Sequence, residues 1–298
     1  MSVGYDLGVN RFLRSASWLD RAGKIFQDAL EGVFERNGEI GLQARSFLNG
    51  TWLGHPLHAA LTDVPIGLWT GGVILDAISL LTGDRSARRA AEWCVGLGCG
   101  GAVAAAVAGM ADFSETEDPQ RRAATAHSIL NGLALTAFAV SLYRRRRGDW
   151  AGSLPYSAIG YALVLVGADI GGHLVYDLGT LVSREAWQKP PREFTTVFAS
   201  EDLANGQMRK VDSNGMGILL ARVNGQVHAI GNTCTHWGCS LAEGGLEDTK
   251  VKCPCHGSVF DLKNGLAVEG PASESEPFFD VREQNGQIQI KLAANSVE

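Results

Sequence analysis

Two pairs of cysteine and histidine near the C-terminus have the residue types and spacing of a metal centre. The first pair, Cys234 and His236, lies in the stretch CTHWGC, and the second, Cys253 and His256, lies in CPCHGS. Two thiolates and two imidazoles suit a [2Fe–2S] cluster in which both cysteines bind one iron and both histidines bind the other. Zinc binds the same atoms and is the alternative. Finger-type zinc sites usually place the cysteines first and the histidines last, so the Cys–His, Cys–His order favours the cluster.

These two stretches resemble the motif of the Rieske family of [2Fe–2S] proteins. The resemblance implies a disulfide between Cys239 and Cys255, which clamps the two loops in respiratory-type members. Two free buried thiols are the alternative. A persistent disulfide is typical of an oxidising compartment. The resemblance also assigns the cluster ligands, which are Cys234, His236, Cys253 and His256.

Three further positions near the motif also resemble the family. Ser258 matches a position whose hydroxyl group donates a hydrogen bond to cluster sulfur. Phe260 stands where respiratory members usually carry a tyrosine with a second such hydroxyl. Fewer hydrogen bonds to sulfur stabilise the reduced cluster less, so we expect a potential below the top of the family's range. The segment Gly270–Ala272 resembles the proline loop that covers the cluster, with an ordinary turn as the alternative.

The elements that position this motif are short strands. Asn-Gly pairs at 224–225 and 285–286 are typical of two-residue β-hairpins. We therefore expect residues 195–298 to form a compact all-β domain of ferredoxin size, preceded by a polar linker over 183–194 with a stiffening Pro-Pro pair. His228 falls on one of these strands, and we expect it to be exposed.

The middle of the chain, residues 51–182, reads as a four-helix transmembrane bundle. Each of its four apolar runs is close to the length that a bilayer span needs, and a buried soluble bundle is the alternative. Residues 1–50 form an amphipathic helical segment, with a helix over about 18–36 that lies on the membrane or packs on the bundle. The expected fold is thus multi-domain, an all-α membrane bundle followed by an all-β Rieske domain. The four runs are 55–82, 93–112, 126–143 and 154–178.

The apolar stretch carries chemistry of its own. Its stretches GHPLH and GGHLVY resemble a family of predicted four-helix membrane domains of unknown function. Because successive spans alternate in direction, four histidines fall on one membrane face. Three readings stay open: ligands of a haem b, a quinone or proton-relay site, and interfacial groups that satisfy one another. These histidines are His55, His58, His127 and His173.

Charge bears on sidedness and partners. A net charge of −6 argues against nucleic acid as a partner. Arginines concentrate in the first and third loops between spans, at 85–89 and 144–147, and positive loops favour the cytoplasm. The Rieske domain would then face outward, although the arginines and lysines of the N-terminal segment oppose this. No continuous apolar run opens the chain, so we expect no cleavable signal peptide.

These features together predict a membrane-anchored Rieske electron-transfer protein. It would accept electrons from quinol or a membrane haem and pass them to a redox protein. The alternative is a ferredoxin component that supplies an oxygenase or reductase, and a non-redox sensor or scaffold is a third reading. We find no facial triad of ligands for a mononuclear iron, so we expect a component of an oxidoreductase system rather than a stand-alone enzyme.

Overall fold

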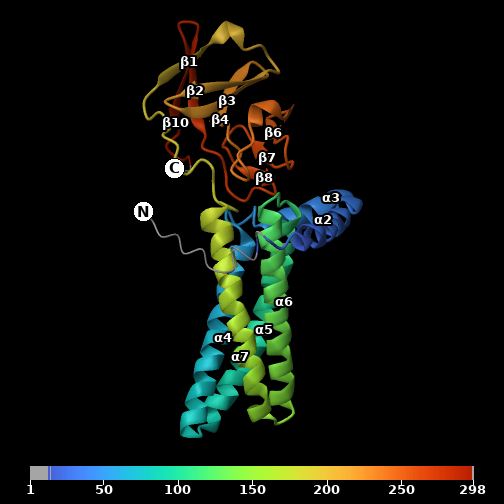
Figure 1. The fold of residues 1–298 in the computed structure, drawn as a ribbon. Helices are drawn as coiled ribbons and strands as arrows, with labels where there is room; N and C mark the ends of the chain where they lie inside the picture. The colour runs from blue at the N-terminus through green and yellow to red at the C-terminus, as the bar shows by residue number, and fades with distance from the viewer. Residues whose placement is uncertain (1–12, 14, 297–298) are drawn as a thin grey trace, which may run out of the picture. The chain divides into compact units, whose positions relative to one another are not determined.

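A computed structural model describes residue 13 and residues 15–296, and the chain divides into two compact units (Figure 1). The first unit joins the chain up to Val33 to Leu57–Thr180. The second joins Phe34–Pro56 to the chain from Leu181 onward. Residues 34–56, which precede the first span in sequence, therefore pack with the strand-rich part of the chain.

The first unit is helical. Four of its helices are long and apolar enough to cross a membrane, as the sequence predicted. The second and third of these four helices extend beyond their apolar runs at both ends, whereas the first lies within its run and the fourth begins four residues before its own. Asp84 and Asp149 cap the second and fourth by accepting hydrogen bonds from Ser86 N and Gly152 N. The helices are α2 (Trp18–Arg36), α4 (Leu57–Thr82), α5 (Arg85–Ser114), α6 (Gln120–Arg146) and α7 (Trp150–Gly172), which continues into the π-helical turn η1 (His173–Asp177).

The bundle consists of two helical hairpins, α4–α5 and α6–α7, that repeat one another. Helices α4 and α6 each contact both α5 and α7, so α4 and α6 lie diagonally across the bundle. They meet through side chains at three levels, and the two partners at every level are 69 residues apart. The levels are His58 with His127, Trp69 with Phe138, and Asp76 with Arg145. A pseudo-two-fold axis therefore runs along the bundle.

Side chains pack tightly across the bundle at two of these levels, Trp69 with Phe138 and Asp76 with Arg145. Trp69 stacks on Phe138 with ring centroids 4.2 Å apart. Arg145 forms two hydrogen bonds to the Asp76 carboxylate, both side chains are almost fully buried, and Trp150 Nε1 donates to Asp76 Oδ1 at 3.1 Å. Burying two charges is favourable only with this degree of hydrogen bonding, so the ion pair fixes how the hairpins meet.

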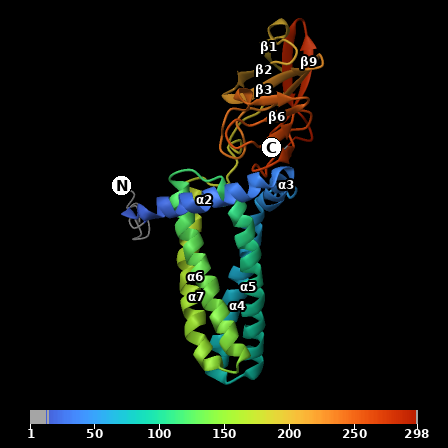
Figure 2. The same ribbon diagram turned by 90° about the vertical axis from the view of Figure 1, so that its right-hand side faces the viewer.

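The expected N-terminal helix is α2, and it takes the second of the two alternatives by packing on the bundle. Leu19 is buried with residues of α6 and α7, Gln27 Nε2 donates to the carbonyl oxygens of Ser114 and Thr116 at 2.9 Å, and Arg122 pairs with Asp20. Its opposite face keeps apolar side chains exposed, namely Trp18, Ile25 and Val33. Helix α2 thus packs across the bundle (Figure 2), and its opposite face presents an apolar surface.

The second unit contains α3 (Gly38–Asn49) and three antiparallel sheets. Both predicted hairpins are present, with positive φ at Asn224, Gly225, Asn285 and Gly286. The sheets are β1 (Thr195–Ala199), β10 (Gln287–Leu292) and β9 (Phe279–Gln284); β2 (Met208–Ser213), β3 (Met216–Val223) and β4 (Gln226–Gly231); and β5 (Gly245–Glu247), β6 (Lys250–Lys252), β7 (Val259–Asp261) and β8 (Ala267–Glu269). Two 3-10 turns complete it, η2 (Ser200–Asp202) and η3 (Leu241–Glu243).

Strand β3 separates two apolar cores. Leu219 and Ala221 face a core that also contains Cys234 and Cys253, and Leu220 faces the core under the outer strands. The expectation for His228 is wrong, because this residue of β4 is buried at 9% exposure in a strand with both faces covered. The cysteines of the motif are therefore part of a packed core.

Candidate metal centre

The two Cys-His stretches form matching loops. The first follows β4 and the second joins β6 to β7. In the first loop Gly238, at φ 83°, donates its N–H to Cys234 O at 2.8 Å, and in the second Gly257, at φ 80°, donates to Cys253 O at 3.2 Å. A left-handed conformation favours glycine at both positions, which explains the Gly two residues after His236 and one after His256.

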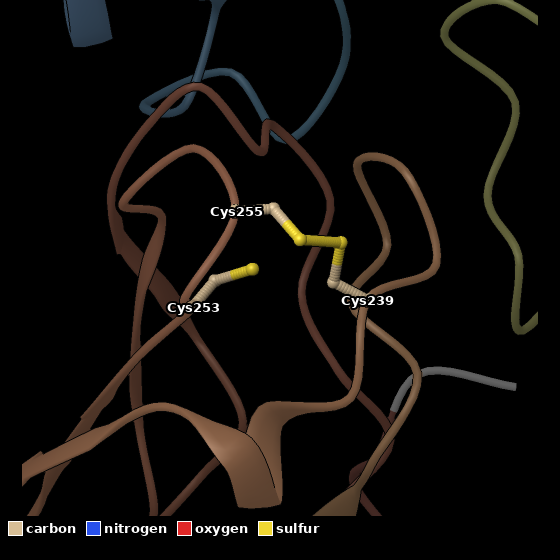
Figure 3. Close-up of side chains that lie close together, drawn as sticks. All are labelled: Cys239, Cys253 and Cys255. Carbon is tan, nitrogen blue, oxygen red and sulfur yellow. A yellow bond between two sulfur atoms is a disulfide. The ribbon is translucent and has the colours of Figure 1, made fainter.

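A disulfide joins the loops. Cys239 and Cys255 are bonded, with Cα atoms 6.5 Å apart, and Figure 3 shows Cys253 beside the bond. The sulfur atoms of all three cysteines lie within 4.8 Å of one another. The two bonded sulfurs have no thiolate to offer, so these three do not form a metal site of their own. The expected disulfide is confirmed.

The other four residues of the motif fit a [2Fe–2S] cluster. Cys234 and Cys253 are buried with free thiols that hydrogen-bond to each other. The rings of His236 and His256 lie 5.0 Å apart. His236 Nδ1 is buried and has no hydrogen-bond partner within the described part of the chain. A buried imidazole nitrogen without a partner costs free energy, and a metal bond would remove this cost.

The hydrogen bond between the two thiols shifts their pKa values in opposite directions. The hydrogen bond from Cys234 lowers the pKa of Cys253 to about 6, helped by the backbone N–H groups of Cys255 and His256. The same bond, followed by burial, raises the pKa of Cys234. The hydrogen bond thus favours the thiolate, the form that binds iron, at Cys253.

Ser258 connects the second loop to the proline loop. Its side chain is fully buried, and its Oγ accepts a hydrogen bond from Ala272 N at 2.9 Å, which leaves its own proton available. From the other side, Thr51 Oγ1 donates to Ala272 O at 3.0 Å, and Ser46 Oγ accepts from Gly270 N at 2.9 Å. The last turn of α3 and the segment after it therefore hold the proline loop against the cluster loops.

Two buried glutamates beside Cys234 escaped the sequence analysis. Glu185 Oε1 accepts from Thr233 N at 3.0 Å and Glu276 Oε1 from Thr235 N at 2.9 Å, one on each side of the ligand. Burial raises the pKa of both, and for Glu276 the Glu185 carboxyl is the next cause. The two carboxyls also lie together, because a Cβ on Gly231 would be 2.8 Å from Glu276 Oε2 and 3.4 Å from Glu185 Cδ.

The two imidazoles of the motif differ in exposure. His236 is buried at 7% exposure, whereas His256 is half-buried. Burial lowers the pKa of His236, and Arg45 and Arg184 lie near enough to lower it further. Arg184, in the segment 183–194 that we expected to be a linker, lies above the Trp237 ring of the first loop. His256 is the better placed of the two to meet another protein.

The four membrane histidines separate into three environments. His58 and His127 come together across the bundle, with ring centroids 6.3 Å apart. His173 instead pairs with Asp177 in the π-helical turn, with Nδ1 and Oδ2 2.6 Å apart. His55 belongs to the second unit, where it lowers the otherwise raised pKa of Glu274. The structure therefore makes a pair rather than a cluster of four.

Comparison with known proteins defines both halves of the chain. Family models match residues 193–286 as a Rieske [2Fe-2S] domain and residues 54–184 as a predicted membrane protein (DUF2231). The 3-phenylpropionate/cinnamic acid dioxygenase ferredoxin subunit of Escherichia coli O139:H28 (strain E24377A / ETEC) is 36% identical over 92 residues, which are 30% of this chain and 86% of that protein. The C-terminal domain is therefore a Rieske [2Fe–2S] domain similar to those of ferredoxins.

The chain belongs to the Rieske family, here joined to a DUF2231 membrane domain. Apoptosis-inducing factor 3 of Mus musculus is 34% identical over 103 residues, and this chain spans only 17% of that protein's length. That match covers 35% of this chain. The ferredoxin of carbazole 1,9a-dioxygenase from Nocardioides aromaticivorans IC177 aligns at 24% identity and a TM-score of 0.32, over 34% of this chain and 98% of that one.

Proposed function

We propose that this protein is a membrane-anchored one-electron carrier. Cys234 and Cys253 hold one iron of a [2Fe–2S] cluster, and His236 and His256 hold the other. The observation that carries the proposal is the buried donor set between two disulfide-clamped loops, in a chain that also has four apolar spans. When bound, the cluster accepts and returns single electrons.

The chain's own residues prepare this site. The Cys253 thiolate and the buried Nδ1 of His236 supply ligand atoms, and the proline loop, held by Ser258 and Thr51, excludes water. The half-buried His256 faces the redox partner. The electrons come from quinol or from a haem in the membrane domain, and the acceptor is a redox protein outside the cytoplasm.

A second candidate function is that of a ferredoxin component. The relatives include ferredoxin components of dioxygenase systems. By that likeness, the domain would supply electrons to an oxygenase or reductase from the cytoplasmic side. Sidedness separates the two functions, because the disulfide persists only in an oxidising compartment.

Spectroscopy of the full-length protein tests the cluster. The reduced protein should give the low-average-g EPR signal of a histidine-ligated [2Fe–2S] cluster. The Cys253→Ser variant should lose it, whereas Cys94→Ser, which removes a free cysteine in α5, should keep it. Zinc without iron in protein made with adequate iron would refute the proposal.

A further inference from the structure

The two histidines on the bundle axis occupy equivalent positions in the two hairpins. His58 Nδ1 lies 2.8 Å from Ala105 O in α5, and His127 Nδ1 lies 2.9 Å from Gly167 O in α7. A carbonyl oxygen only accepts hydrogen bonds, so each Nδ1 carries the proton and each Nε2 keeps its lone pair. A hydrogen bond of this kind is what fixes the tautomer of a metal-binding histidine. Both rings therefore present a ligand nitrogen.

The spacing of the rings fits one metal atom between them. Their centroids are 6.3 Å apart and their planes are 86° to each other. With metal–nitrogen bonds of about 2.0–2.1 Å, two imidazoles on opposite sides of one metal have ring centres roughly 6 Å apart. Stacked rings lie closer, as Trp69 and Phe138 do at 4.2 Å, whereas perpendicular rings in edge contact have centroids up to about 7 Å apart. Each imidazole rotates about its own metal bond, so perpendicular planes are compatible with this arrangement.

The chemistry of the pair selects haem. Among the described residues, three or more His, Cys, Asp or Glu ligand atoms come close enough to hold an ion at the disulfide and not at this histidine pair. A bare metal ion bound by His58 and His127 would therefore lack further protein ligands. Haem brings four nitrogen ligands and needs only axial ones from the protein. A quinol hydroxyl would donate to only one of the two Nε2 lone pairs, whereas a haem iron binds both. Haem is thus the cofactor that two such histidines complete.

Glycines lie against both histidines at this level of the bundle. The levels of Trp69 and Asp76 are closed by stacking and by the ion pair, whereas His58 and His127 are only half-buried. A Cβ on Gly109 would lie 2.8 Å from His58 Nδ1, and one on Gly171 would lie 3.3 Å from His127 Cε1. Figure 2 shows the two hairpins separating toward this end.

We propose that His58 and His127 are the axial ligands of a haem b within the membrane bundle. This inference rests on the proposed function, which gives the haem its role as electron donor. It deepens that function by choosing haem over quinol as the group that the membrane domain binds. The haem iron lies on the pseudo-two-fold axis, with one ligand from each hairpin.

Haem content of the purified full-length protein tests this. A pyridine haemochrome assay should find one haem b per chain. His58→Leu and His127→Leu should lower the haem content about tenfold or more, since each removes an axial ligand. His173→Leu is the matched control, because this histidine lies in the same unit but bonds to Asp177, and it should keep its haem. All variants should keep the Rieske EPR signal, which shows that they fold.

Conservative variants cover the case of misfolding. His127→Met supplies a thioether ligand, so it should keep haem while its reduction potential shifts, which a structural role would not cause. Wild-type protein with a full cluster and no haem would overturn the haem site and leave the electron carrier standing. Haem retained in both leucine variants would also overturn it. Haem without a Rieske signal would instead contradict the proposed function.

Discussion

Phe260 lies two residues after Ser258 and is completely buried in β7, where a tyrosine hydroxyl would lie beside the cluster loops. We expect Phe260→Tyr to raise the reduction potential by tens of millivolts, because a hydroxyl that donates to cluster sulfur stabilises the reduced form. Rieske potentials span about −150 to +300 mV, so protein-film voltammetry would resolve such a change. The matched control is Phe260→Leu, which stays apolar and should keep the wild-type potential. An unchanged potential in the tyrosine variant with an intact cluster would count against this role.

Glu276 makes the stability of the second unit depend on pH. Its pKa is raised by burial and by Glu185, so the folded protein holds a proton that the unfolded chain releases. The free energy of unfolding therefore falls as the pH rises from the ordinary glutamate pKa toward the raised one. The fall is about 1.4 kcal/mol for each pH unit between the two pKa values. Glu276→Gln should remove this loss and become increasingly stabilised, relative to the wild type, at higher pH.

Thermal loss of cluster absorbance, measured across that pH range, checks this prediction. The control is Glu247→Gln, at an exposed glutamate in β5, which should follow the wild type at every pH. Parallel pH profiles of the wild type and Glu276→Gln would show that the carboxyl is ionised in the folded protein as well.

For single residues, roles within short motifs could be predicted from the sequence, and contacts between distant residues could not. The resemblance to the Rieske motif implied the disulfide and the four ligands Cys234, His236, Cys253 and His256, because the motif lies in two short stretches of sequence. The roles of Glu185 and Glu276 could not be predicted, since they bond to the backbone of residues 48 and 41 positions away. A glutamate that binds a remote backbone N–H leaves no pattern in a single sequence.

Helix packing in the bundle depends on glycines that face the axial aromatic residues. A Cβ on Gly98 would lie 2.6 Å from the Trp69 ring, which is itself fixed against Phe138. Gly98→Ala should therefore destabilise the bundle by about 1–3 kcal/mol through overpacking. The same helix offers a control at Gly100, where a Cβ would meet nothing within 4 Å.

Gly100→Ala should be neutral or more stable by up to about 1 kcal/mol, because alanine is the better helix former. Unfolding of both variants by sodium dodecyl sulfate in mixed micelles measures the difference. Equal stabilities would mean that Trp69 moves away freely and that the stacked level does not constrain the helices.

Hydropathy revealed the four spans, but the repeat within them went unseen. The residues that correspond between hairpins differ in type at two of the three axial levels, where Trp69 matches Phe138 and Asp76 matches Arg145. Only His58 and His127 are identical, and one coincidence does not define a repeat. The pairing depends on helix orientation, which side-chain contacts across the bundle determine.

The sidedness of the whole molecule follows from insertion electrostatics. Arg145 does not contribute to this bias, because Asp76 neutralises it within the bundle. Other arginines remain near the first and third turns between spans, so the rule still favours this side in the cytoplasm. They are Arg85, Arg88 and Arg89 at the start of α5 and Arg144, Arg146 and Arg147 at the end of α6. We expect a periplasm-active reporter to work when fused after the C-terminal residue and to fail within the loop at 146–149.

Thiol labelling provides an independent control, because it reports on the redox compartment rather than on charge. Protein from intact cells should show Cys239 and Cys255 unreactive until a reductant is added. The reverse reporter pattern with free thiols would place the domain in the cytoplasm and favour the function of a ferredoxin component.

The pairing of Asp76 with Arg145 has a consequence for how such a bundle arises. Two copies of the first hairpin would bring aspartate against aspartate at the same level, and two copies of the second would bring arginine against arginine. Each hairpin therefore repels its own kind and attracts the other. A bundle built from two identical hairpins would therefore lose this ion pair and bury two like charges in its place.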